Sequence, residues 1–132
     1  IAFDKQMQRL KRQTILITLG LSVLVILLAK PLLAWLDKPT YSKHFSLLYW
    51  TVLASALSAL SMIPHYGLYA HRRDRPIILS HLASLPIFLI AVYLLNMVLS
   101  EAAIPAAMAI TFLFLLCSKA LFFRRCLPFS AT

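Results

Sequence analysis

Long apolar stretches alternate with short polar ones along the whole chain. The apolar stretches cover about residues 14–36, 45–69, 76–99 and 103–123. A helix rises about 1.5 Å per residue, so each stretch is long enough to cross the roughly 30 Å hydrocarbon core of a bilayer. The pattern therefore predicts an all-α fold, an integral membrane bundle of four transmembrane helices.

The polar stretch between the second and third apolar stretches is a short basic turn. It carries Arg72, Arg73 and Arg75 within four positions. Short loops rich in Lys and Arg stay in the cytoplasm. Of the 13 Lys and Arg residues, ten lie in this turn, near the N-terminus or at the end of the fourth stretch, and three lie on the other side. This asymmetry predicts that both termini are cytoplasmic.

Two terminal segments flank the predicted spans. Residues 1–13 place Phe3, Met7 and Leu10 at helical spacing among basic residues, which predicts a short amphipathic segment on the cytoplasmic membrane surface. A cleaved signal peptide is the competing interpretation, but the apolar run is too long and no small-residue cleavage site follows it. Residues 126–132 form a tail that is too short for an element of its own.

The composition supports a membrane protein. Hydrophobic residues make up 61% of the chain and charged residues 13%, against about 45–50% and about 25% in soluble domains. A net charge of +9 could suggest nucleic acid. However, the basic residues are grouped between apolar runs, where membrane topology explains them. We therefore expect the lipid bilayer as a partner and no nucleic acid.

The second apolar stretch carries a row of three small hydroxyl residues and one methionine at helical spacing. Its members are Thr51, Ser55, Ser58 and Met62. Small side chains let another transmembrane helix approach closely, so we predict a helix-packing face; a hydroxyl-lined path is the alternative. Pro64 and Gly67 near the end of this stretch, and Pro86 in the third, predict helix hinges, because proline removes a backbone donor.

Catalytic and metal-binding patterns are missing from the sequence. The four acids lie in loops or termini, with no Ser/His/Asp set and no metal spacing, so we expect no enzyme, no metal and no cofactor. Cys117 and Cys126 are expected to be free thiols rather than a disulfide. Lys119 can snorkel to the cytoplasmic surface and Asn96 lies near the opposite interface, so neither is assigned a role.

A cationic cytoplasmic mouth is the best candidate site. Its residues are His65, Arg72, Arg73, Arg75 and His81, with His71 beside them. Arginine binds phosphate through two parallel hydrogen bonds where the geometry permits, so an anionic head group would be attracted there. The alternative is that these residues only determine topology.

Two short motifs resemble a known family. Pro64-His65-Tyr66-Gly67-Leu68-Tyr69-Ala70 resembles a "P-Y-x-L-L-x-A" pattern before a basic turn, with the proline, the second leucine and the alanine in place. His81-Leu82-Ala83-Ser84-Leu85-Pro86 matches an "H-L-x-x-L-P" helix start. This order resembles the C-terminal region of bacterial polysaccharide flippases, the O-antigen and exopolysaccharide exporters of the multidrug/oligosaccharidyl-lipid/polysaccharide superfamily. Ala103-Ile104-Pro105-Ala106-Ala107 departs from the family, which usually has glycines there.

The resemblance implies transport of a polyprenyl-pyrophosphate-linked oligosaccharide across the bacterial inner membrane, for lipopolysaccharide or other polysaccharide biosynthesis. Family members have twelve or more spans, and the chain starts at Ile1 rather than Met, so we expect it to be the last part of a longer transporter. The alternative is a small four-helix subunit that packs against a larger partner and does not transport by itself. Small four-span multidrug exporters fit less well, because the first span carries no glutamate.

Overall fold

The computed structural model describes residues 2–36 and 44–126 and is entirely helical over them. The helices are α1 (Ala2–Trp35), α3 (Phe45–Ala70), α4 (Asp74–Leu99) and α5 (Ala103–Cys126), with a 3-10 turn, η1 (Ser100–Ala102), between α4 and α5. The predicted all-α class is confirmed. The predicted ends of the last three apolar stretches agree with these bounds to within three residues.

The helices are long and apolar enough to cross a membrane. Over the described residues three continuous helical stretches meet this description: Asp4–Trp35, Phe45–Ala70 and Asp74–Arg125. The last of them contains α4, η1 and α5. Large apolar side chains cover the outside of the molecule, with Trp35, Val98 and Met97 each more than 70% exposed. Such a surface suits lipid rather than water.

Helix α1 is continuous at its N-terminal end. Residues 1–13 were predicted to form an amphipathic segment on the membrane surface that leads into the first span, and α1 runs from Ala2 to Trp35 without a break. No glycine or proline occurs before Gly20, so nothing in the sequence ends the helix after the basic residues. The basic residues of the N-terminus therefore extend α1 along its own axis.

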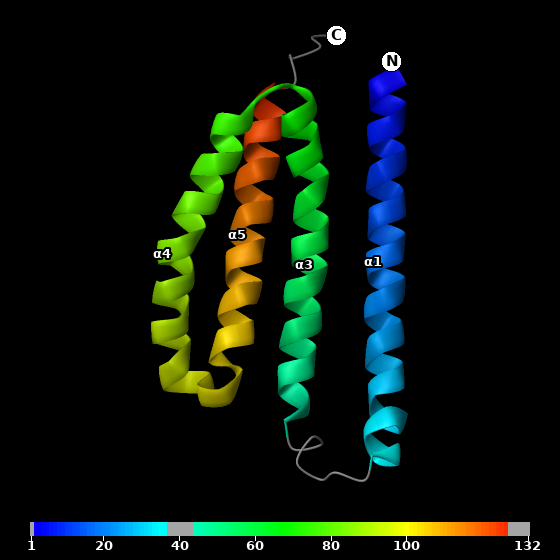
Figure 1. The fold of residues 1–132 in the computed structure, drawn as a ribbon, viewed down its shortest axis with the longest axis vertical. Coiled ribbons are helices and arrows are strands. Elements are labelled where there is room, and N and C mark those ends of the chain that lie inside the picture. Colours follow the sequence, from blue (N-terminus) through cyan, green and yellow to red (C-terminus); the bar gives the residue numbers. More distant parts are fainter. Residues whose placement is uncertain (1, 37–43, 127–132) are drawn as a thin grey trace.

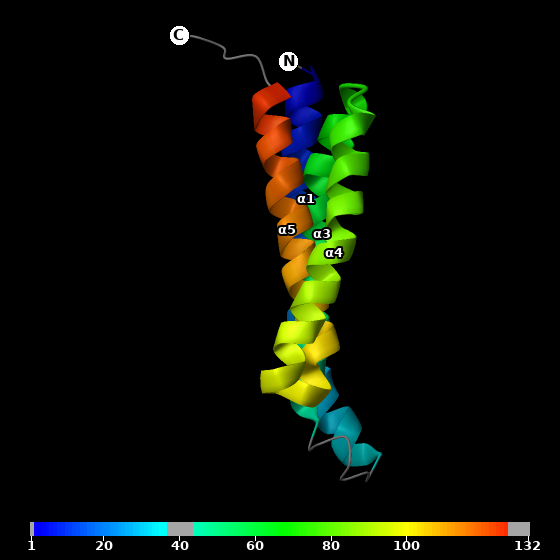
Figure 2. The same cartoon turned by 90° about the vertical axis from the view of Figure 1, so that its left-hand side faces the viewer.

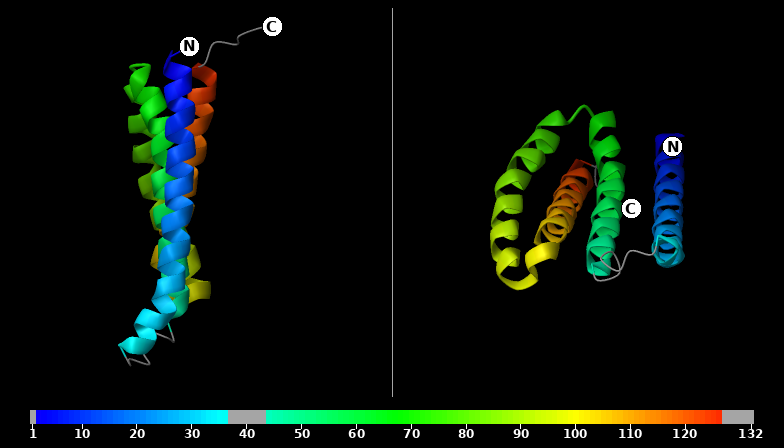
Figure 3. Two further views of the ribbon diagram at one scale, coloured as in Figure 1. Left: turned by 90° about the vertical axis from the view of Figure 1, so that its right-hand side faces the viewer. Right: turned by 60° about the horizontal axis from the view of Figure 1, so that its bottom comes forward.

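The helices run up and down, and α5 lies between α3 and α4 (Figure 1). Helix α5 packs against both of them, whereas α3 and α4 contact each other little and α1 contacts α3. In the view at right angles the helices overlap, so the bundle is flatter in that direction (Figure 2). The start of α1, the α3–α4 turn and the end of α5 share one end of the bundle (Figure 3), which we call the basic end.

The core is a row of side chains on α5 at every fourth position. These residues are Ala103, Ala107, Thr111, Leu115 and Lys119, each at most 8% exposed. Each step of four residues turns about 40° around a helix, so the row winds across α5 as a broad buried face, and its alanines let neighbouring helices approach closely. The Thr111 hydroxyl donates to the Ala107 carbonyl at 2.8 Å, so its polar group is satisfied within α5. This face explains the central position of α5.

The α3–α4 turn closes with a Schellman motif. The Arg73 amide donates to the Leu68 carbonyl (3.1 Å) and the Arg72 amide to the Tyr69 carbonyl (2.9 Å). These two bonds place Arg72 at the position where helices usually have glycine. Its φ of 54° lies in the left-handed region. Since a side chain there crowds the following carbonyl, the arginine strains the backbone of this turn.

Replacing Arg72 with Gly is expected to raise the free energy of unfolding by about 1 kcal/mol, because it removes this left-handed strain. Denaturant titration in mixed micelles measures the change. Arg73→Gly is the matched control, since it removes the same charge at a residue with φ of −107° and should gain nothing. Equal stabilities of the two variants would show that the turn is not strained at Arg72.

Candidate functional site

A polar cluster, made of a buried lysine and two more exposed imidazoles, lies where α3, α4 and α5 meet. Lys119 is the last member of the buried row on α5 and is only 1% exposed. It is the bulkiest fully buried side chain in the described part of the protein. Its ammonium group therefore lies among the helices. The sequence had suggested instead that Lys119 snorkels to the cytoplasmic surface. Polar side chains that bundles keep in this position usually have a function.

Two imidazoles complete the cluster, His65 from α3 and His81 from α4. Their ring centroids are 6.4 Å apart, and Lys119 is near enough to both for its charge to act on them. The Nδ1 atom of His65 is buried and has no hydrogen-bond partner in the described structure. Buried polar atoms without partners are rare, and such atoms usually bind a water, an ion or a ligand.

The cluster contains positive or neutral groups and no described carboxylate. The described acids are Asp4, Asp74 and Glu101, all near helix ends. Glu101 of η1 contacts the His44 imidazole at the end of the bundle opposite the basic end. No ion pair between Lys119 and an acid occurs within residues 2–36 and 44–126. The site can therefore bind an anionic group that does not belong to the described residues.

The depth of the cluster places it close to the basic end. His65 precedes the end of α3 by five residues, His81 follows the start of α4 by seven, and Lys119 precedes the end of α5 by seven. At 1.5 Å per residue this depth is about 10 Å. Such a depth is near the boundary between lipid head groups and hydrocarbon when the basic end is at the membrane surface.

The predicted mouth residues are only partly brought together. Arg72, Arg73 and Arg75 are exposed on the α3–α4 turn, whereas His65 is half-buried and His81 is exposed, with their ring centroids 6.4 Å apart. The arginines and the imidazoles therefore form two successive layers along the helix axes, the arginines at the turn and the imidazoles further from it. Arg124 and Arg125 of α5 are also exposed at the basic end.

The predicted hinge residues lie in continuous helices. Helix α3 contains Pro64 and Gly67, both buried, and α4 contains the exposed Pro86. A Cβ atom added to Gly67 would lie 2.5 Å from the ring of Phe123 on α5. Gly67 thus allows a close approach of α3 and α5, and its predicted hinge role stays a prediction.

The predicted packing row on α3 points mainly toward α1. Thr51 and Ser55 line a pocket between α1 and α3, and the Thr51 hydroxyl donates to the Leu47 carbonyl at 2.7 Å. The Ser58 carbonyl accepts a hydrogen bond from Ser61 at 2.7 Å, and Met62 is 41% exposed. The Thr51 and Ser61 hydroxyls thus form hydrogen bonds within their own helix.

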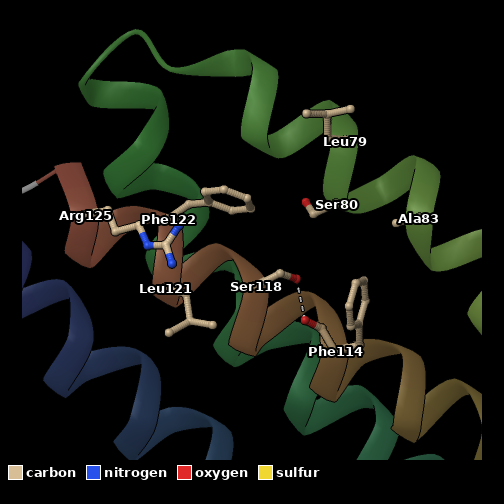
Figure 4. Close-up of a pocket in the computed structure, with 8 residues that line it drawn as sticks. All are labelled: Leu79, Ser80, Ala83, Phe114, Ser118, Leu121, Phe122 and Arg125. Carbon is tan, nitrogen blue, oxygen red and sulfur yellow. Dashed lines mark hydrogen bonds between the residues drawn. The ribbon is translucent and has the colours of Figure 1, made fainter.

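A groove of about 410 Å³ lies between α4 and α5 near the basic end (Figure 4). Leu79, Ala83 and Phe114 make its wall apolar, and the Arg125 guanidinium lies at one end. The Ser118 hydroxyl donates to the Phe114 carbonyl at 2.5 Å, and Ser80 donates to Ile77 at 2.8 Å. The groove therefore offers apolar surface, and Arg125 is its charged group.

Lys119 is the residue that sequence reasoning did not assign to the site. The available signal was the spacing of four from Thr111 through Leu115, which places Lys119 on the same broad face of α5 as these two residues. A lysine on that face points at neighbouring helices, whereas a lysine on the leucine-rich face points at lipid. The nearby Arg124 made a snorkelling lysine the simpler interpretation.

The described residues hold no group of three His, Cys, Asp or Glu side chains that could bind a metal ion. Cys117 is an exposed free thiol, and Cys126 lies outside the residues whose side chains are described. The charged and imidazole groups at the basic end include the acids Asp4 and Asp74 beside the lysines, arginines and histidines. Comparisons with models of protein families, with curated proteins and with solved structures found no match to this chain.

Proposed function

We propose that this chain belongs to a membrane transporter that moves an anionic, lipid-linked oligosaccharide, as in bacterial polysaccharide flippases. The observation that supports the proposal is the buried Lys119 beside His65 and His81, with no described acid to pair it. An anion inside a bilayer is costly unless a positive group accompanies it. A phosphate of the substrate would supply the missing negative partner.

The proposed topology has four spans with both termini in the cytoplasm of a bacterial inner membrane. Helices α4 and α5 run in opposite directions about η1 (Figure 1), which supports one crossing for each of them. The start of α1, the α3–α4 turn and the end of α5 would then meet the cytoplasm, as the positive-inside rule favours.

In this mechanism the two layers of positive groups act in succession. The exposed Arg72, Arg73 and Arg75 attract the pyrophosphate of the substrate at the cytoplasmic surface. Lys119, about 10 Å deeper, receives the phosphate as it leaves the head-group region. The transfer needs movement of helix bundles, and rocking of rigid bundles is the usual route in secondary transporters. Pro64, Gly67 and Pro86 are the proposed hinges, and further helices of a longer chain would complete the pathway.

Neutralising the outer layer tests the proposal. In the protein at its native length, we expect Arg72→Gln/Arg73→Gln/Arg75→Gln to slow flipping of a polyprenyl-pyrophosphate oligosaccharide in vesicles by about tenfold or more. A membrane-impermeant quencher of a fluorescent substrate measures the rate. Labelling of single cysteines with an impermeant thiol reagent measures the topology in the same variant.

The comparison of rate and topology separates the explanations. Slower flipping with an unchanged topology supports the binding role of the arginines. An inverted topology would show that they only orient the chain. A wild-type protein that binds no lipid-linked oligosaccharide and moves none would contradict the transporter and favour a non-transporting subunit that packs against a larger partner.

A further inference from the structure

A second pocket at the basic end is built by three helices. It encloses about 420 Å³ between α1, α3 and α5. Lys11 of α1 and Arg124 of α5 are its charged residues, and Leu60, Ile63, Leu116 and Phe123 are among its apolar ones. This volume lies within the range of about 300–1,000 Å³ that small-ligand sites occupy. The pocket shares no residue with the Lys119 cluster.

The two charges of this pocket come from helices that are distant in sequence. Lys11 and Arg124 are both exposed, and neither forms an ion pair within the described residues. Arg124 lies two residues before the end of α5, and Lys11 lies nine residues after the start of α1, in the halves of these helices that are nearer the basic end. Between them they can hold one anionic group at the level where phospholipid phosphates lie.

The apolar part of the site continues along α1. A further pocket of about 370 Å³ lies between α1 and α3 and is lined by Thr18, Ser22 and Val25. Together with Met7, Lys11 and Ile15 of the first pocket, these residues follow a spacing of three or four, which is one face of a helix. The inner face of α1 therefore borders two successive pockets instead of closely packed side chains.

We propose that one anionic phospholipid of the bilayer occupies this face, with its phosphate between Lys11 and Arg124 and an acyl chain along α1. Basic pockets between transmembrane helices on the cytoplasmic side bind such head groups. The acyl chain fills space that would otherwise separate α1 from α3 and α5. The lipid thus joins α1 to the rest of the bundle, and this role is independent of the proposed transport.

Native mass spectrometry of the protein at its native length, in detergent micelles, tests this proposal. Titration with phosphatidylglycerol and with phosphatidylcholine of the same acyl chains should show one phosphatidylglycerol bound more tightly. Lys11→Gln/Arg124→Gln should weaken this binding by about 30-fold, since each basic residue near an anionic head group contributes about fivefold. Ala120→Trp, which fills the pocket and keeps both charges, should weaken it as well.

Lys5→Gln/Arg9→Gln is the matched control, because it removes two exposed positive charges of α1 that do not line the pocket. It should change the affinity by no more than about threefold. Equal losses in the two double variants would show that only the net charge attracts lipid. Equal binding of the two lipids, or full displacement by inorganic phosphate with no effect of Ala120→Trp, would also overturn the proposal.

Discussion

Replacing Lys119 with Met is expected to stabilise the helix bundle and to abolish transport of an anionic substrate. Lys119 is 1% exposed and has no described acidic partner. A lysine inside a membrane bundle is unfavourable compared with an apolar residue, by about 2.5–3.5 kcal/mol at the bilayer centre and by less near the head groups. Met has a similar length without the charge, so part of this free energy should return as stability.

The same substitution should lower the transport rate by about 100-fold, which corresponds to about 2.7 kcal/mol of lost interaction with a phosphate. A positive group that interacts mainly during passage of the anion contributes to rate rather than to stability. The two effects thus have opposite signs, as often occurs at functional sites. Unfolding in mixed micelles and flipping in vesicles measure them separately.

Two controls define the role of Lys119. Lys119→Arg keeps a positive charge at the same position and should retain more transport than Met. Lys30→Met removes an exposed lysine of α1, and it should change neither quantity much. If Lys119→Met transported at the rate of the wild-type protein, or lost stability, the buried lysine would be a structural residue and the proposed path of the anion would be wrong.

Gly67→Ala is the second substitution with a large expected effect. A Cβ atom at this position would lie 2.5 to 2.9 Å from three atoms of the Phe123 ring. The ring lies beside His71 with centroids 6.1 Å apart and borders the pocket between α1, α3 and α5, so it must shift to accept the added atom. Overpacking of this kind is unfavourable by about 1–3 kcal/mol. We therefore expect a loss of stability, although alanine alone favours a helix by about 1 kcal/mol over glycine.

Gly20→Ala is a direct control for this prediction. Gly20 lies within α1 and has no atom within 4 Å of an added Cβ, so the alanine should raise the free energy of unfolding by up to about 1 kcal/mol. Phe123→Leu in the Gly67→Ala background should restore part of the lost stability, because the smaller side chain makes room. Equal effects of alanine at Gly20 and Gly67 would show that α3 and α5 do not approach closely there.

Helix positions could be predicted because they depend on local patterns. The apolar stretches at residues 45–69, 76–99 and 103–123 became α3, α4 and α5 with small shifts. The turn at Ser100, Glu101 and Ala102 became η1. Uncharged runs of this length form helices because each backbone group must find its hydrogen bond within the segment when lipid surrounds it. The predicted boundary between the N-terminal segment and the first span, after residue 13, is not a helix end, because charge alone does not end a helix.

The candidate site was only partly predictable for a different reason. The arginines of the basic turn could be recognised from their clustering, and they are exposed as expected. Whether Lys119 meets lipid or other helices depends on which face of α5 becomes central. The face of α5 that becomes central depends on how α5 packs between α3 and α4. This packing needs small side chains from all three helices at the same level along the bundle.

The sequence by itself determined the helical class, the apolar surface and the placement of positive charge near the chain's turns and ends, because these follow from composition and spacing along the chain. Only the tertiary structure decided that Lys119 joins His65 and His81, that Gly67 meets Phe123, and that Lys11 and Arg124 share a pocket. These contacts join residues from different helices. They depend on how the helices rotate and pack against each other, which no single helix specifies.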